Sequence, residues 1–352
     1  MGREIRLNAF SMNCVAHQSP GLWRHPRDRS SDYHRLSYWT DLAQTLERGK
    51  FDGLFLADVL GVYDVFGQGP QGALRQAAQV PVNDPLLLVS AMAHVTRHLG
   101  YGVTCNLSYE PPYTFARRMT TLDHLTDGRI GWNVVTGYLD SAARGAGRAR
   151  QTAHDERYDL AEEYMEVVYK LWEQSWDDDA AVRDRGAGVF VDPDKVRRVV
   201  HHGARYDVDA IHLCEPSPQR TPVIYQAGTS PKGRQFAARH AECVFVSGPS
   251  AKVIAPRVAD IRRLAALNGR RGEDIQFFSM MTVILGETEA QARAKHEEYR
   301  AYASREGALV LMSGWTGVDF STLDLDQQVR HVANDAGRTA MDNITRADPD
   351  RT

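Results

Sequence analysis

The chain has 352 residues, of which 43% are hydrophobic and 25% are charged, and its formal net charge is −3. These values are ordinary for a globular protein and argue against the strongly basic composition of a nucleic-acid-binding protein. No apolar run approaches the roughly 18 residues of a membrane span, and the N-terminus lacks the apolar core of a signal peptide. The four cysteines are scattered without metal-ligand spacing, so we predict reduced thiols in a cytoplasmic protein.

The first half of the chain alternates apolar strands with amphipathic helices. We predict strands over residues 5–10, 51–57, 99–104 and 128–138. Asp84-Pro85 provides an N-cap and a first-turn proline for one helix. The most informative helix begins at His154 and continues to Trp172, with apolar residues near 3.6-residue spacing. A loop of roughly 25 residues after Asp58 is longer than most connections and predicts a functional segment.

The second half continues the alternation after a polar insertion over residues 177–220. We predict strands over 222–227, 243–246 and 275–285, and a helix over 288–304. From Glu306 onward the chain is rich in Gly and Asp with little periodicity. The sequence therefore predicts one domain over 1–352, with an insertion at 177–220 and an irregular segment at 305–352.

Seven strands alternating with helices predict a parallel sheet. No Gly-x-Gly-x-x-Gly motif follows the first strand, which disfavours an open dinucleotide-binding sheet. Polar residues instead follow successive strands, as at the active face of a (β/α)8 barrel. They are Asn13, Asp58, Thr104, Asn133, Thr136 and Ser230. Because only seven strands are predicted, we expect a barrel truncated before its eighth strand.

The residues alone leave several alternatives open. Residues 228–233 could hold a phosphate at a helix N-terminus, although an ordinary turn with a Ser230 cap explains the pattern slightly better. His154 and Tyr158 share a helix face if the helix begins by His154, yet a structural histidine and a core tyrosine explain the residues alone better than a binding site does. Cys14 has no base in a recognisable motif and is better explained as a pocket-lining thiol. His201-His202 lacks further ligands at metal-binding spacing, which favours a solvated loop and no metal site.

Five ordered segments are typical of one family. They are residues 54–59, 116–125, Trp-Asn-Val-Val-Thr at 132–136, His-Asp-Glu-Arg-Tyr at 154–158 and residues 222–228. On these residues the chain resembles the bacterial-luciferase-like flavin monooxygenases, in the group of nitrilotriacetate and dibenzothiophene-sulfone monooxygenases. Residues 80–85 and 213–220 resemble in particular the branch that contains the long-chain alkane and dimethyl sulfide monooxygenases.

The resemblance implies a (β/α)8 barrel that binds reduced FMN at the carboxyl ends of its strands. It implies that a separate NAD(P)H:FMN reductase supplies the FMN, by contact or by diffusion alone. It further implies a flavin C4a-hydroperoxide, formed with O2, that oxygenates a small apolar substrate such as an alkane or an organosulfide. A homodimer or homotetramer is expected, with no nucleic-acid or membrane partner.

The same resemblance assigns site residues. Those expected to contact the flavin are Asp58, Thr104, His154, Tyr158 and, at the phosphate, Ser230. Those expected on the substrate side are Phe10, Cys14, His17, Tyr63, Gln79 and Tyr138. His154 and Tyr138 are the candidate catalytic residues. Tyr138 departs from the alkane branch, which carries His there, so the substrate is left open. Two alternatives remain, a deazaflavin-dependent oxidoreductase of the same superfamily and an inactive truncated flavin-binding barrel.

Overall fold

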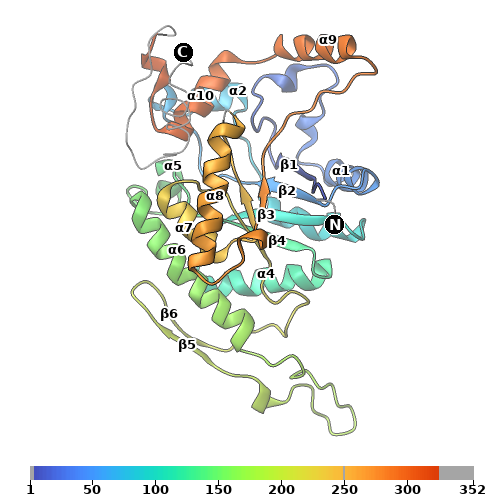
Figure 1. Ribbon diagram of the computed structural model, residues 1–352, viewed down its shortest axis with the longest axis vertical. Coiled ribbons are helices and arrows are strands. Elements are labelled where there is room, and N and C mark those ends of the chain that lie inside the picture. The colour runs from blue at the N-terminus through green and yellow to red at the C-terminus, as the bar shows by residue number, and fades with distance from the viewer. Residues whose placement is uncertain (1–3, 249, 325–352) are drawn as a thin grey trace.

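A parallel sheet of seven strands forms the centre of the molecule (Figure 1). The structure is a computed structural model that describes residues 4–248 and 250–324. In sheet order the strands are β1 (Asn8–Met12), β2 (Gly53–Ala57), β3 (Gly100–Asn106), β4 (Ile130–Val135), β7 (Val223–Gln226), β8 (Cys243–Phe245) and β9 (Gln276–Phe278). Every neighbouring pair is parallel. Within the described range, β1 and β9 are the two edges of this sheet.

The sheet curls until side chains from distant strands meet inside it. The Phe55 ring of β2 lies 5.7 Å from the Tyr225 ring of β7 and 4.4 Å from the Phe245 ring of β8. Since β3 and β4 separate β2 from β7, a flat sheet would hold these side chains roughly 14 Å apart. Gly102 and Gly131, on the two intervening strands, leave the space that the Tyr225 ring fills. The predicted barrel-type α/β fold is therefore confirmed.

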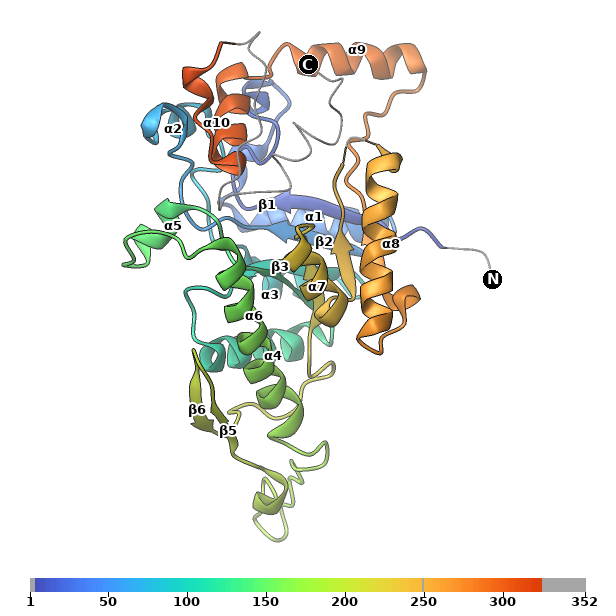
Figure 2. The ribbon, with the colours of Figure 1, turned by 60° about the vertical axis from the view of Figure 1, so that its left-hand side comes forward.

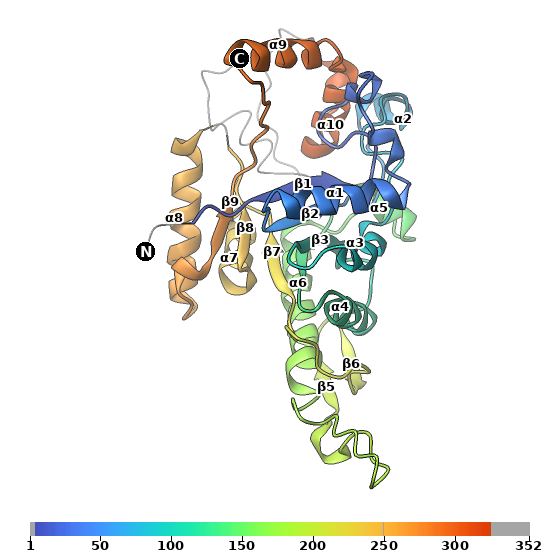
Figure 3. The same ribbon diagram turned by 90° about the vertical axis from the view of Figure 1, so that its right-hand side faces the viewer.

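Helices pack around the outside of the curled sheet, and a further group lies above it in the views of Figures 2 and 3. The helices around the sheet are α1 (Leu36–Arg48), α3 (Val89–His94), α4 (Pro112–Thr126), α6 (His154–Tyr169), α7 (Pro231–His240) and α8 (Ala251–Leu267). The group above it is formed by α2 (Gln71–Gln76), α9 (Glu289–Arg300) and α10 (Arg305–Thr316), and the short α5 (Asp140–Gly145) follows β4. The Trp132 ring of β4 packs against Phe115 of α4 at 4.4 Å and Tyr164 of α6 at 6.0 Å. Among the described residues, no helix is both long and apolar enough to cross a membrane.

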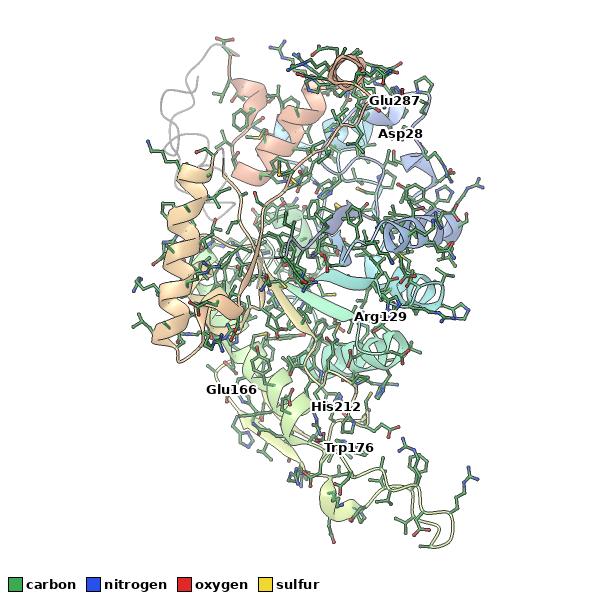
Figure 4. The ribbon with its side chains drawn as sticks, turned by 45° about the vertical axis from the view of Figure 1, so that its right-hand side comes forward. Asp28, Arg129, Glu166, Trp176, His212 and Glu287 are labelled. Carbon is green, nitrogen blue, oxygen red and sulfur yellow. The ribbon has the colours of Figure 1, made fainter. Side chains whose placement is uncertain are left out.

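The insertion projects away from the sheet as an arm that carries a hairpin of β5 (Val199–His202) and β6 (Asp207–Ala210) (Figure 1). Trp176 and His212 lie together where the arm leaves the body, and Trp176 Nε1 donates to the His212 carbonyl at 2.7 Å (Figure 4). The prediction of a solvated loop at His201-His202 is wrong for His201. Its side chain is 5% exposed and faces Glu163, because strand alternation turns His201 inward and His202 outward.

Two further expectations need correction. The strand predicted over 275–285 ends at Phe278, and the apolar residues beyond it are exposed, with Met281 at 82% and Leu285 at 75%. At an edge of the sheet, β9 has only the three residues of β8 to pair with. The irregular segment predicted from 305 contains α10, which the Ser304 side chain caps by accepting from Gly307 N. Residues 325–352 lie outside the described range.

Candidate active site

A cavity of about 290 Å³ lies at the carboxyl ends of the strands. The ends of β2, β3, β4 and β7 line it together with the first turns of α6 and α7. Seven residues selected from the sequence meet there, namely Asp58, Thr104, Thr136, Tyr138, His154, Tyr158 and Ser230. Segments separated by up to 172 positions in the chain therefore converge on one space, as expected for the active face of a barrel.

The first turn of α6 forms one wall. Ala161, Met165 and Val168 are fully buried and fix the helix against the sheet, which turns His154 and Tyr158 into the cavity. His154 Nδ1 lies 2.7 Å from the Asp155 carboxylate, and the His154 and Tyr158 ring centroids are 5.4 Å apart. The predicted common helix face is thus confirmed.

The loop between β7 and α7 forms the adjoining wall. Ser230 Oγ caps α7 by accepting from Gly233 N at 3.1 Å, so the predicted capped turn is present. A Cβ on Gly228 would lie 2.2 Å from the Tyr158 hydroxyl, so only glycine allows this close approach to α6. Because Ser230 itself lines the cavity, the positive end of the α7 dipole borders the space in which an anion could bind.

Asp58 places a carboxyl group in the cavity at the end of β2. Burial raises its pKa to about 7, the nearby charge of Asp84 adds to this, and the Val59 backbone N–H opposes it. Asp58 is therefore held near the balance between its protonated and charged forms at neutral pH.

Two buried amide oxygens test whether a flavin fits these residues. Gln226 Oε1 belongs to a residue that lines the cavity. Asn133 Oδ1 belongs to a residue of β4 whose Nδ2 donates to Thr104 Oγ1, and Thr104 lines the cavity. Neither oxygen has a hydrogen-bond partner among the described residues. Buried acceptors without donors are costly, and a reduced flavin ring carries N–H donors. Together with the anion-compatible α7 terminus, this donor requirement fits FMN.

The predicted substrate-side residues form a cluster next to the cavity. Rings of Phe10 and His17 lie 4.8 Å apart, Gln79 Nε2 donates to the His17 carbonyl at 2.9 Å, and Tyr63 donates to Gln79 Oε1 at 3.0 Å. Tyr138 connects this cluster to the cavity, since it lines the cavity and its hydroxyl lies 2.5 Å from that of Tyr63.

Ionisation in the cluster follows from burial. Burial raises the pKa of the Cys14 thiol to about 12 and lowers the pKa of His17 to about 4. Cys14 is therefore a neutral thiol at physiological pH, which argues against a nucleophile, and its place on the substrate side stays a prediction.

Trp315 of α10 is a neighbour of the site that the sequence interpretation missed. Its Nε1 donates to the Tyr63 hydroxyl at 3.1 Å, across 252 positions of the chain. The Ser304 cap, the apolar residues Val310 and Leu311, and the Gly317 stop were a usable helix signal. That signal would have located α10, but its position against Tyr63 depends on tertiary packing.

Comparison with known proteins identifies the family. The protein-family model described as luciferase-like monooxygenase matches residues 10–351 of the sequence. The chain is 52% identical over 345 residues to the dimethyl-sulfide monooxygenase of Hyphomicrobium sulfonivorans, covering 98% of this chain and 72% of that protein. It is 54% identical over 321 residues to the long-chain alkane monooxygenase of Geobacillus thermodenitrificans, covering 91% and 73%.

Solved structures agree in fold. The crystal structure of a long-chain alkane monooxygenase superposes with a TM-score of 0.92 at 50% identity, covering 99% of this chain and 80% of that one. A riboflavin lyase, solved with modified FMN and substrate riboflavin, superposes with a TM-score of 0.92 at 35% identity, covering 97% and 76%. The resemblance stated from sequence motifs is confirmed: the chain belongs to the luciferase-like monooxygenase family.

Proposed function

We propose that this protein binds reduced FMN in the cavity at the strand ends and uses it with O2 to oxygenate a small apolar molecule. The observation that carries the proposal is the convergence of Asp58, Thr104, His154, Tyr158 and Ser230 on one cavity. The relatives named above act on dimethyl sulfide and on long-chain alkanes, which supports an organosulfide or an alkane as the substrate.

Individual residues take distinct roles in this proposal. Reduced FMN, when bound, supplies the activation of O2. Ser230 and the N-terminus of α7 hold the phosphate, and the Gln226 amide oxygen accepts from the ring. Asp155 orients the His154 imidazole at the cavity wall. Asp58, with a pKa of about 7, can hold or release a proton at neutral pH.

The cavity also has to exclude water, because a reactive oxygenating site loses its product yield when solvent reaches it. Val134 and Phe236 supply buried apolar surface to its lining. The cluster around Tyr63 supplies further cover from the substrate side. The long segment after Asp58 contributes Val59 and Tyr63 to these walls, in line with the functional role predicted for that loop.

Partners and compartment complete the proposal. We infer that a separate NAD(P)H:FMN reductase supplies reduced FMN, since no nicotinamide-binding fingerprint occurs in the sequence. Homodimer or homotetramer formation stays a prediction. All four cysteines are free, which supports a reducing compartment such as the cytoplasm.

The decisive experiment measures oxygen uptake and product formation with FMN, NADH, a flavin reductase and a panel of n-alkanes and organosulfides. We expect substrate-dependent incorporation of one oxygen atom per O2 consumed. His154→Ala should weaken binding of reduced FMN or lower the product yield per O2 by about 10-fold or more. The matched control is His296→Ala, which removes a histidine that is 54% exposed on α9.

Other results would reassign the protein. If His154→Ala keeps full affinity for reduced FMN and full coupling of O2 consumption to product formation, His154 has no role in the site. Hydride transfer to a deazaflavin cofactor without O2 would instead support the deazaflavin-dependent oxidoreductase, and weak FMN binding without turnover would support an inactive barrel.

A further inference from the structure

Four hydrogen bonds link the substrate-side residues into one network. Gln79 Nε2 donates to the His17 carbonyl at 2.9 Å. The Tyr63 hydroxyl lies 3.0 Å from Gln79 Oε1, 3.1 Å from Trp315 Nε1 and 2.5 Å from the Tyr138 hydroxyl. Tyr63 is 2% exposed and Gln79 is 4% exposed, so water does not compete for these groups.

Counting hydrogens fixes the direction of each bond. A backbone carbonyl only accepts, so the Gln79 group that faces His17 is its NH2, and Gln79 Oε1 faces Tyr63. Trp315 Nε1 only donates, so Tyr63 accepts from it. The single hydrogen of Tyr63 goes to Gln79 Oε1, which has no other donor among the described residues. The remaining partner, Tyr138, therefore donates its own hydrogen to Tyr63.

The direction of the last bond determines what Tyr138 offers to a ligand. Burial raises the pKa of Tyr138 to about 12, so its hydroxyl carries one hydrogen at physiological pH. The bond to Tyr63 uses that hydrogen and is the only hydrogen bond of the hydroxyl among the described residues. The Tyr138 oxygen accepts no hydrogen bond from the described residues, so its lone pairs are available as an acceptor, and Tyr138 lines the cavity.

We propose that Tyr138 is a specificity-determining hydrogen-bond acceptor, which favours apolar ligands that carry one O–H, N–H or S–H donor over isomers that carry only an acceptor. This inference rests on the proposed function and deepens it by naming a feature of its products, since an alcohol or a thiol carries a donor whereas an alkane or a dialkyl sulfide has none. A buried acceptor discriminates strongly, because a ligand without a donor leaves it unpaired. Tyr138 consequently does not deliver a proton in this state of the network.

The packing around Tyr63 holds the network in this arrangement. A Cβ on Gly314 of α10 would lie 1.8 Å from the Tyr63 ring, so the helix backbone and the ring are in direct contact. α10 also docks on α2 through the Arg75–Glu306 ion pair at 2.8 Å. Because α10 carries Trp315, its docking helps to fix the Tyr63 hydroxyl, and Trp315 is a positioning residue that acts through Tyr63.

Octanol and its isomer heptyl methyl ether test the inference, since only octanol has a donor. Equilibrium titration of the intact chain, with and without oxidised FMN, gives the ratio of the two dissociation constants. We expect the wild type to bind octanol about 10-fold more tightly, the factor of one ordinary hydrogen bond. Tyr138→Phe should bring the ratio near one. Tyr63→Phe frees the Tyr138 hydrogen, so the ether should gain affinity.

Tyr113→Phe is the matched control, because it removes a tyrosine hydroxyl that donates to the Ile211 carbonyl and does not line the cavity, and the preference for octanol should remain. Circular dichroism and thermal unfolding confirm that each variant folds. Equal binding of the two isomers by the wild type, no binding of either, or an unchanged preference in Tyr63→Phe would overturn the inference. Loss of the proposed function is separate, since it would appear as absent FMN binding while the ligand preference persists.

Discussion

Asp58 places a titratable carboxyl group at the cavity, and its raised pKa makes the stability of the protein depend on pH. The ordinary value of 3.8 rises to about 7, chiefly through burial and then through Asp84. The folded chain therefore binds this proton more tightly than the unfolded chain, so the contribution of Asp58 to stability falls as pH rises from about 4 to about 7 and is constant above.

Asp58→Asn removes this dependence. We expect the variant to gain more stability relative to wild type at pH 8 than at pH 5, by up to about 3 kcal/mol, since the pKa lies about two units above pH 5 and each unit corresponds to about 1.4 kcal/mol. Urea unfolding at the two pH values measures the difference. Asp41→Asn, an exposed carboxyl on α1, should show no such change. If the effect of Asp58→Asn on stability does not change with pH, the pKa of the Asp58 carboxyl group is not raised in the folded protein.

Gly228 is the residue whose missing side chain shapes the cavity wall between α6 and α7, where we propose that the flavin binds. In Gly228→Ala, the Cβ would lie 2.2 Å from the Tyr158 hydroxyl and 2.5 Å from Gln226 Nε2, so one wall has to move. We expect FMN affinity to fall by about 10-fold or more, measured by fluorescence titration. Gly145→Ala is the control, since its Cβ would meet nothing within 4 Å. Equal affinities in the two variants would place the flavin elsewhere.

At the scale of elements, one carboxylate of α6 holds the hairpin of the insertion. Glu163 accepts from the backbone N–H groups of Arg205 and Tyr206, at 2.9 and 2.8 Å, and from His201 Nε2 at 3.3 Å. Burial alone would raise the pKa of Glu163, but these donors outweigh it and hold the pKa below its usual value. The stabilisation is therefore present at neutral pH and is lost as pH falls into the titration range of glutamate.

Glu163→Ala should loosen the turn between β5 and β6. We expect a loss of about 1–3 kcal/mol and faster amide hydrogen exchange over residues 203–206, because two backbone donors lose their acceptor. Asp159→Ala serves as the control on the same helix, since its ion pair with Lys232 is at the surface. Unchanged exchange in Glu163→Ala would mean that the hairpin is held by its own strand pairing.

Helices and strands could be predicted where local sequence signals agree. Features whose position depends on tertiary packing were missed. The Asp84 cap accepts from Leu86 N as predicted, and the periodicity from His154 gave α6 its correct start. The inward direction of His201 depends on the register of a hairpin within a polar segment, which composition does not reveal. The position of α10 depends on contacts with Pro20 and Tyr63, both distant in the chain.

For the whole molecule, strand order followed from the regular alternation of strands and helices, and the positions of polar residues at strand ends predicted the cavity. Family motifs supplied residues that spacing alone left open, such as Ser230 and Tyr158. The hydrogen-bond directions around Tyr63 could not be predicted, since they arise from four segments that meet only after the sheet has curled. Sequence thus predicted where the cavity lies, and tertiary packing set the donor and acceptor pattern of the residues around it.

The curl itself can be tested at Gly131. In Gly131→Ala, the Cβ would lie 2.7 Å from Tyr225 Cε2 and 3.0 Å from the Val223 carbonyl oxygen, so the interior of the sheet becomes overpacked. We expect a loss of about 1–3 kcal/mol in urea unfolding. In the double variant Gly131→Ala/Tyr225→Leu, the loss of unfolding free energy should be smaller than the sum of the losses in the two single variants, because the smaller leucine leaves room for the new methyl group. Strict additivity would mean that the Tyr225 ring does not fill the space inside the curled sheet.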